Sequence, residues 1–74
     1  MDEKIAIDTT FIKLGQLIKR ANILESGGMV KSFIREEGAL VNGQREHRRG
    51  RKLYPGDVVK IDGLGTWTVV KKEM

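Results

Sequence analysis

The chain has 74 residues, 39% of them hydrophobic and 32% charged, which fits one small folded domain and leaves no room for a second. It has no cysteine and one histidine, which excludes a disulfide scaffold and a cysteine zinc site and argues against a histidine-rich metal site. The net charge is +4 and no apolar run approaches the roughly 18 residues of a membrane span, so we expect a soluble, cytoplasmic, monomeric domain over residues 1–74 without a cofactor.

The first part of the chain predicts a strand and a helix. Apolar residues at alternate positions predict a short strand over residues 4–7. Apolar side chains then recur with helical spacing at Phe11, Leu14, Leu17, Ile18 and Ala21. We expect Thr9 or Thr10 to cap this helix, Asn22 to end it, and Phe11 to lie in the core.

A second helix is predicted to begin after Ser26, whose hydroxyl can accept a hydrogen bond from a first-turn amide. Its apolar face is supplied by Val30, Phe33 and Ile34, with Phe33 expected in the core. Gly38 is the expected C-terminal stop of this helix.

Short strands follow the second helix. The pair Asn42-Gly43 is typical of a two-residue type I′ turn between paired strands. Turn residues then precede strands over residues 58–61 and 66–70, and Trp67 is expected to pack in the core or at the sheet edge. The order predicts an α+β fold in which two packed helices lie on a small antiparallel sheet of about four to five short strands.

The whole net charge lies in residues 45–52, here called the basic segment. It contains five basic residues and one acid, while nine basic and nine acidic residues balance elsewhere. Such a segment is typical of a surface that binds a polyanion, and nucleic acid is the commonest one in cytoplasm; the alternative is a solvated charged loop. The candidate binding residues are Arg45, Arg48, Arg49, Arg51 and Lys52.

Both helices offer a basic face. Lys13, Gln16 and Arg20 share the polar side of the first helix, and Lys31 and Arg35 share that of the second. These residues extend the candidate surface, although outward charges are also usual for any surface helix.

Ser26, Gly27 and Gly28 are candidates for a different reason. If Ser26 caps the second helix, the two glycines leave amide groups uncovered at the positive end of the helix dipole, where phosphate binds readily. The alternative is that these glycines only let the two helices pack closely.

No catalytic site is expected. His47 lies in the basic segment and has no cysteine partner, so we expect a solvated histidine near phosphates. Glu36 and Glu37 point to different sides of a helix, and no glycine-rich phosphate loop has the required spacing. We therefore expect neither an enzyme nor a small-molecule substrate.

Several stretches of the chain resemble a known family. Residues 13–19 read Lys-Leu-Gly-Gln-Leu-Ile-Lys, residues 26–34 read Ser-Gly-Gly-Met-Val-Lys-Ser-Phe-Ile, and residues 40–43 read Leu-Val-Asn-Gly. This pattern resembles the alpha-L RNA-binding motif, the S-four domain named after a small-subunit ribosomal protein. Residues 48–59 resemble the stand-alone bacterial members of the YaaA and YbcJ type. The likeness covers residues 4–70, with a motif core over residues 13–61.

The resemblance implies a non-catalytic protein that recognises structured RNA through the basic hairpin and a helix face. It suggests ribosomal RNA or a ribosomal subunit or assembly particle, and transfer RNA or small RNAs would use the same surface. It implies that Lys13 replaces a leading arginine, Ser26 supplies a hydroxyl and Lys31 supplies the basic residue of the second helix. Gly15 and Gly27 depart from the family pattern, which has an acid and an arginine there. We expect alanine at positions 48, 49 and 51 together to weaken RNA binding and leave the fold intact.

Two other functions remain open from the sequence. Helix, turn, helix and hairpin also fit a winged DNA-binding module that reads a major groove. A protein adaptor whose basic segment docks on an acidic partner is the other alternative.

Overall fold

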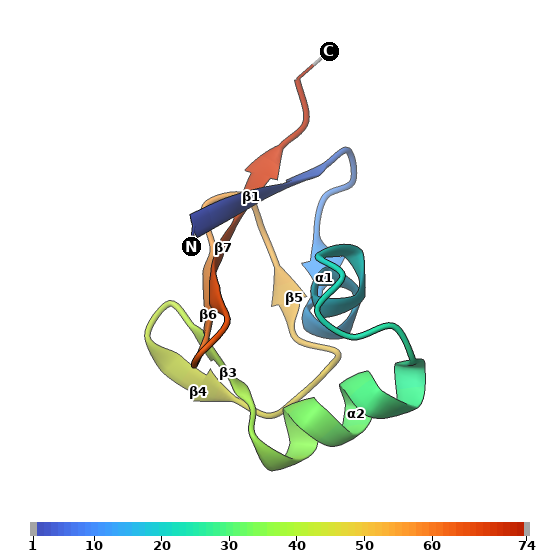
Figure 1. Cartoon of the computed structure of the whole chain (residues 1–74). Helices are drawn as coiled ribbons and strands as arrows, with labels where there is room; N and C mark the ends of the chain where they lie inside the picture. Colours follow the sequence, from blue (N-terminus) through green and yellow to red (C-terminus); the bar gives the residue numbers. More distant parts are fainter. Residues whose placement is uncertain (1, 74) are drawn as a thin grey trace.

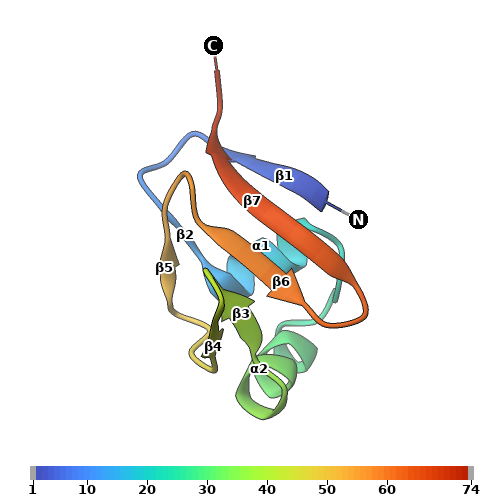
Figure 2. The same cartoon turned by 90° about the vertical axis from the view of Figure 1, so that its left-hand side faces the viewer.

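The computed structural model describes residues 2–73, in which strands and helices follow one another with short connections (Figure 1). The first half contains β1 (Asp2–Ile7), β2 (Ile12–Lys13), α1 (Leu14–Arg20) and α2 (Gly27–Glu36). The second half contains β3 (Ala39–Val41), β4 (Gln44–Glu46), β5 (Lys52–Leu53), β6 (Val58–Ile61) and β7 (Gly65–Lys71). Both helices lie on one side of the main sheet, behind it in the view of Figure 2. The predicted α+β class, with two helices packed on a small sheet, is confirmed.

The main sheet is mixed rather than antiparallel throughout. Its strand order is β1-β7-β6-β3-β4, and the pairs from β7 to β4 are antiparallel as predicted. β1 instead runs parallel to β7, with Asp2 opposite Thr66 and Ile7 opposite Lys71. A parallel pair needs a long crossover connection, and here the whole intervening chain supplies it. Such pairing between the two ends leaves no local signal in the sequence.

Asn42 and Gly43 form the predicted hairpin turn. Their φ angles are +52° and +86°, as a type I′ turn requires, and Val41 pairs with Gln44 across it. The Asn42 side chain also ties the turn to the start of β6: its Nδ2 donates to Asp57 Oδ1 at 3.0 Å, and its Oδ1 accepts from the Val58 N–H at 2.9 Å. The turn therefore fixes both the hairpin and its position on the sheet.

Asn42→Ala is expected to lower the free energy of unfolding by about 1–2 kcal/mol, because it removes both side-chain contacts and places alanine in the left-handed region. Asn22 offers a matched control, since its φ is +59° and no hydrogen bond of its side chain occurs among the described residues. Asn22→Ala should cost about half as much. Denaturant unfolding of both variants measures the difference, and equal losses would contradict the role given to the contacts with Asp57 and Val58.

The start of α1 differs from the prediction. Residues 12 and 13 are not helical, because Ile12 and Lys13 pair with Leu53 and Lys52 in a second, two-stranded sheet. The expected cap by Thr9 or Thr10 is therefore wrong. The first amides of α1 find their acceptors far along the chain, since Leu14 and Gly15 donate to backbone carbonyls of the segment between β4 and β5. Gln16 Oε1 adds a local contact by accepting from the Lys13 N–H at 3.0 Å.

The predicted ends of both helices are otherwise confirmed. Asn22 follows α1 in the left-handed conformation, as expected for a stop residue. Ser26 caps α2, and its Oγ accepts from the Gly28 N–H at 3.2 Å. Gly38 ends α2 with a φ of +75° and donates its N–H to Phe33 O at 3.1 Å.

The core lies between the main sheet and the helices. Its buried residues are Ile7, Ile12, Leu14, Leu17, Ile18, Val30, Ile34, Ala39, Val41, Leu53, Val59, Ile61, Trp67 and Val69. Trp67 is buried as expected, and its Nε1 donates to Glu3 Oε2 at 2.9 Å. Phe33 is partly buried against this core.

Phe11 lies outside the core, contrary to the prediction. It belongs to the loop before β2 rather than to the first turn of a helix. Its ring packs against Tyr54, with ring centres 6.1 Å apart. Because β2 pairs with β5, α1 begins only at Leu14, and Phe11 is therefore not part of its apolar face.

Candidate functional site

The basic loop, residues 47–51, joins β4 to β5 and packs against the start of α1. The Gly15 N–H donates to Arg49 O and the Leu14 N–H donates to Arg51 O, both at 2.9 Å. A Cβ added at Gly15 would lie 3.4 Å from Arg49 Cβ and 3.6 Å from Val30 Cγ1, so a large side chain has no space there. The loop carbonyls thus cap α1, and the loop has a fixed position on the helix rather than a freely solvated one.

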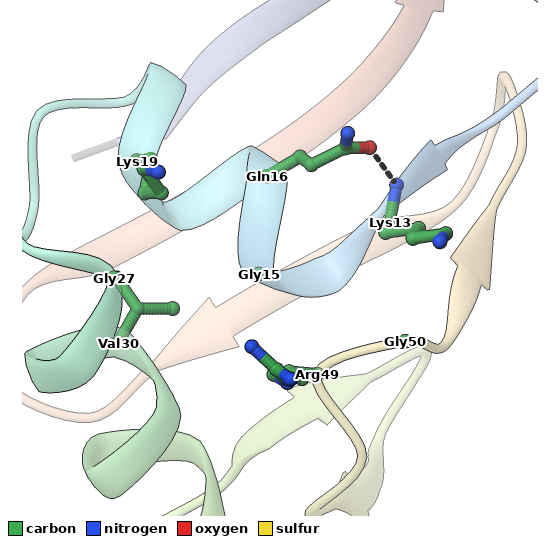
Figure 3. Close-up of a pocket in the computed structure, with 8 residues that line it drawn as sticks. All are labelled: Lys13, Gly15, Gln16, Lys19, Gly27, Val30, Arg49 and Gly50. Atoms are coloured by element: carbon green, nitrogen blue, oxygen red, sulfur yellow. Dashed lines mark hydrogen bonds between the residues drawn. The ribbon is translucent and has the colours of Figure 1, made fainter.

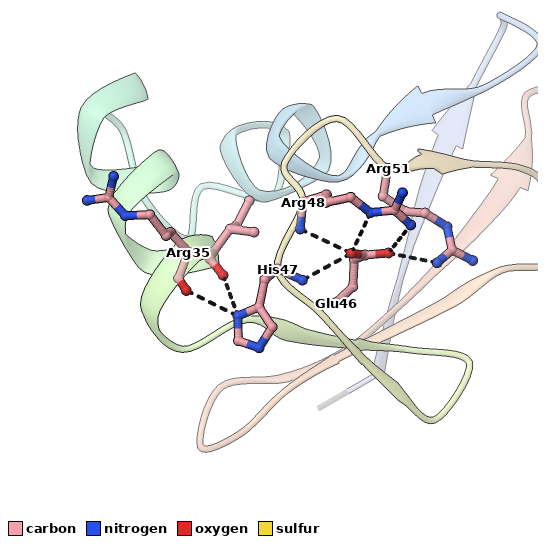
Figure 4. A network of polar contacts seen from close by, with 6 residues as sticks. Arg35, Glu46, His47, Arg48 and Arg51 are labelled. Carbon is pink, nitrogen blue, oxygen red and sulfur yellow. Dashed lines mark hydrogen bonds and ion pairs between the residues drawn. The ribbon is translucent and has the colours of Figure 1, made fainter.

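Glu46, the only acid of the basic segment, stabilises the loop through its carboxylate (Figure 4). The residue is 8% exposed and lies at the end of β4. Its carboxylate accepts from the backbone N–H groups of His47 and Arg48, both at 3.1 Å. It also accepts from Arg48 Nε at 3.0 Å and Arg51 Nη1 at 2.9 Å. One side chain therefore ties together both ends of the loop.

These contacts change the acidity of the carboxyl group. The side-chain hydrogen bonds of Arg48, assisted by those of Arg51, lower the pKa of Glu46 from 4.5 to about 2, against the opposing effect of burial. The same hydrogen bond raises the pKa of Arg48. Glu46 thus remains ionised throughout the neutral range and offsets part of the charge of both arginines.

The arginines of the basic segment are consequently not equivalent. Arg48 and Arg51 form ion pairs with Glu46. Arg45 donates to Glu37 O at 3.2 Å and forms a longer, exposed ion pair with Asp62 at 3.4 Å. Within residues 2–73, the ion pairs do not include Arg49. Alanine at positions 48, 49 and 51 would remove the partners of Glu46 along with Arg49, so we now expect that change to affect folding as well as binding.

His47 is exposed as predicted but is anchored to α2. Its Nδ1 lies 3.1 Å from Ile34 O and 3.2 Å from Arg35 O. Both partners are carbonyl acceptors, so Nδ1 carries the proton and donates. The histidine therefore fixes the loop to the C-terminal end of α2.

An open groove of about 450 Å³ lies between α1, the start of α2 and the basic loop; we call it the Arg49 groove (Figure 3). It is lined by Lys13, Gly15, Gln16, Lys19, Gly27, Val30, Arg49 and Gly50. Lys13 directly before α1, Lys19 on α1 and Arg49 in the basic loop lie around Gly15. No acid lines the groove, and the ion pairs found within the described residues include none of these three cations. The groove therefore carries exposed and uncompensated positive charge.

Gly27 lines the groove at the start of α2. A Cβ added at Gly27 would meet nothing within 4 Å, so close packing between the helices does not require this glycine. Gly27 forms the first turn of α2 behind the Ser26 cap. Its backbone therefore lies uncovered at the positive end of the helix dipole, where an anion is favoured.

The structure brings only part of the predicted surface together. Lys13, Gln16, Gly27 and Arg49 line the Arg49 groove, whereas Arg48, Arg51 and Lys52 line a shallow depression that shares Gly50 with it. Arg20 lies in a hollow with residues 8–12, and Arg45 lies beside Phe33. The remaining predicted site residues are exposed outside the groove: Ser26 at the cap of α2, and Gly28, Lys31 and Arg35 on the helix itself.

Lys19 is a groove residue that the sequence analysis missed. It lies four residues after Gly15, and residues at this spacing share one face of a helix. The loop packs on Gly15, so the neighbouring Lys19 is carried into the groove. The sequence alone does not show that Lys19 lines a groove, because this depends on where the loop packs on α1.

Residues 2–73 include no group of three or more His, Cys, Asp or Glu side chains arranged to hold a metal ion. Neither helix in this part of the chain has the length and apolarity to cross a bilayer.

The chain is similar to a known family and to a curated bacterial protein. The family model of the S4 domain matches residues 5–70, which include every residue of the Arg49 groove. The "Probable ribosome maturation protein RlbA" of Bacillus subtilis (strain 168) is 53% identical over 70 residues, covering 95% of this chain and 99% of that protein. No solved structure matches the chain at a significant level.

Proposed function

Because the chain belongs to the S4 domain family, we propose that it is a non-catalytic RNA-binding protein with a ribosome-related role. The family and the relative's name support the general role. The finer proposal is that it recognises structured RNA, namely ribosomal RNA or a ribosomal assembly particle. The observation that carries it is the convergence of Lys13, Lys19 and Arg49 on one groove without an acid.

The proposed mechanism is recognition of phosphates rather than of base sequence. Folded RNA presents phosphates and 2′-hydroxyl groups on its surface, while the base edges in its deep groove are hard to reach. The guanidinium of Arg49 suits two phosphate oxygens at once, and Lys13 and Lys19 act as point charges. The uncovered backbone at Gly27 adds a neutral donor for a phosphate at the α2 end of the groove.

The loop is organised before RNA arrives, which supports the proposal energetically. Glu46 and His47 hold the loop from two sides, and α1 binds its carbonyls. Ordering a flexible basic loop upon binding would cost affinity, and this cost is reduced when the loop already has its bound shape. Glu46 thus lowers the local charge but places Arg49 in the groove.

The remaining basic residues extend the proposed RNA surface on either side of the groove. Arg48, Arg51 and Lys52 would contact phosphates near the loop, with the first two weakened by their pairing to Glu46. Ser26, Gly28, Lys31 and Arg35 would extend the surface along α2, and Arg20 and Arg45 would lie at its margins. We further propose that residues 1–74 act as a single, monomeric, cytoplasmic RNA-binding domain; Met1 and Met74 lie outside the described residues.

Binding of a structured ribosomal RNA fragment is expected to weaken steeply with salt. If about five to seven phosphates are neutralised, log K falls against log salt concentration with a slope of about −4 to −6. Filter binding or fluorescence anisotropy over a salt series measures the slope. A slope near zero would refute phosphate recognition.

The alternatives make different predictions in the same assay. A duplex DNA of matched sequence is the control, and tighter binding to DNA than to RNA would favour the winged module. Co-sedimentation with ribosomal particles, before and after nuclease treatment, tests the adaptor. Loss of the protein from the particle fractions after RNA digestion supports direct RNA binding, whereas retention on a protein partner contradicts it.

A further inference from the structure

A hollow lies beside the Arg49 groove and shares Gln16 with it. It is formed by residues 8–12 together with Gln16 and Arg20, and we call it the Phe11 hollow. Its lining has one acid, Asp8, and one basic residue, Arg20, whereas the groove has three cations and no acid. The groove therefore attracts an anion, while the balanced charge of the hollow suits a ligand without net charge.

One side of the hollow is formed by an aromatic side chain, Phe11, which lies outside the buried core. Phe11 is partly exposed, and its ring packs on Tyr54 at an interplanar angle of 54°, with Tyr54 itself 46% exposed. Lys52 Nζ lies 4.9 Å from the centre of the Phe11 ring. The loop that carries Phe11 is fixed locally, since Thr9 Oγ1 donates to Phe11 O at 2.9 Å. A positioned and partly exposed aromatic ring thus lies next to the proposed phosphate site, with the Lys52 ammonium over it.

The rest of the lining offers hydrogen-bonding groups. Asp8 and Gln16 provide acceptor oxygens, and Gln16 and Arg20 provide donors. Ile12 also borders the hollow but is only 6% exposed. A flat ligand with a π face and a polar edge matches both features, and a nucleobase is such a ligand.

We propose that the Phe11 hollow binds one unpaired nucleobase of the RNA whose phosphates occupy the Arg49 groove. This inference rests on the proposed function. Bases displaced from a helix in loops and bulges are recognised by stacking on aromatic side chains and by hydrogen bonds to their edges. Because Gln16 lines both sites, adjacent parts of one RNA strand can reach the groove and the hollow together.

The test compares two short RNA hairpins that differ in a single bulged nucleotide, 2-aminopurine, which is fluorescent. The wild-type protein is expected to bind the bulged hairpin about five- to tenfold more tightly than the fully paired one, near the lower end of what one stacked base contributes. Its binding should also quench the 2-aminopurine. Phe11→Leu, which keeps an apolar side chain but removes the ring, should abolish the preference and the quenching while affinity for the paired hairpin stays unchanged.

Phe33→Leu is the matched control, because Phe33 lies on α2 beside Arg45, outside the hollow. It should keep the preference for the bulged hairpin, and circular dichroism checks that both variants fold. Equal affinity of the wild type for the two hairpins, or equal effects of the two leucine variants, would overturn the base subsite while leaving RNA binding in place. Failure of the wild type to bind either hairpin would overturn the proposed function itself.

Discussion

Replacing Lys13, Lys19 and Arg49 together by alanine is expected to weaken binding to structured RNA by about a hundredfold or more at low salt, because three charge-assisted phosphate contacts are lost. The slope of log K against log salt should also become about 2 to 3 smaller in magnitude. All three side chains are exposed and lie outside the ion pairs of the described residues, so no buried acid loses its partner. The fold should therefore be unchanged, as circular dichroism and thermal unfolding will show.

A control variant with the same change in net charge distinguishes phosphate contacts in the groove from the general electrostatic attraction between the protein and RNA. Lys4, Lys60 and Lys72 are exposed on or next to the sheet strands and lie outside the Arg49 groove. Alanine at these three positions should weaken RNA binding less than about tenfold, through the long-range field alone. A loss equal to that of the groove variant would refute the groove as the binding site.

Glu46→Ala is expected to lower the free energy of unfolding by about 2–4 kcal/mol, a large part of the roughly 4–11 kcal/mol expected for a domain of this size. The change removes the acceptor of Arg48, Arg51 and two loop amides at once. Glu36→Ala is the matched control, because Glu36 is exposed on α2 and should cost less than about 0.5 kcal/mol. Urea unfolding measures both, and a Glu46 loss no larger than that of Glu36 would show that the carboxylate does not stabilise the loop.

The lowered pKa of Glu46 adds a pH signature to this prediction. A carboxyl group whose pKa is lower in the folded state stabilises the fold fully above its unfolded pKa, and that contribution is lost as the pH falls through the folded pKa. For Glu46 the window runs from about pH 4.5 down to about pH 2. Wild-type stability should fall across this window more steeply than that of Glu46→Gln, which carries no titrating group there. Parallel pH profiles would contradict the assignment.

The parts of the fold that the sequence predicted well depend on local signals. Ser26 and Gly38 mark the ends of α2, and Asn42-Gly43 marks the hairpin, because capping and left-handed turns are properties of a few adjacent residues. The family resemblance drawn from residues 13–43 is confirmed by the match over residues 5–70 and by the bacterial relative.

The errors share one physical cause, which is pairing between distant residues. β2 pairs with β5 and so delays α1, which leaves Phe11 outside the core and Thr9 and Thr10 without a capping role. β1 joins β7 in parallel across nearly the whole chain. The periodicity of apolar residues describes one segment at a time, so it does not show which distant strands pair with each other.

The sequence by itself determined that this is a small α+β domain of the S4 type and that its entire net charge lies in residues 45–52. It did not determine which of those charges are free. The tertiary structure decided this, because the fold buries Glu46 where Arg48 and Arg51 must neutralise it and leaves Arg49 beside Lys13 and Lys19. The charge of a segment can be counted from the sequence. Whether each charged side chain is paired with an opposite charge depends on which side chains the fold places within contact distance.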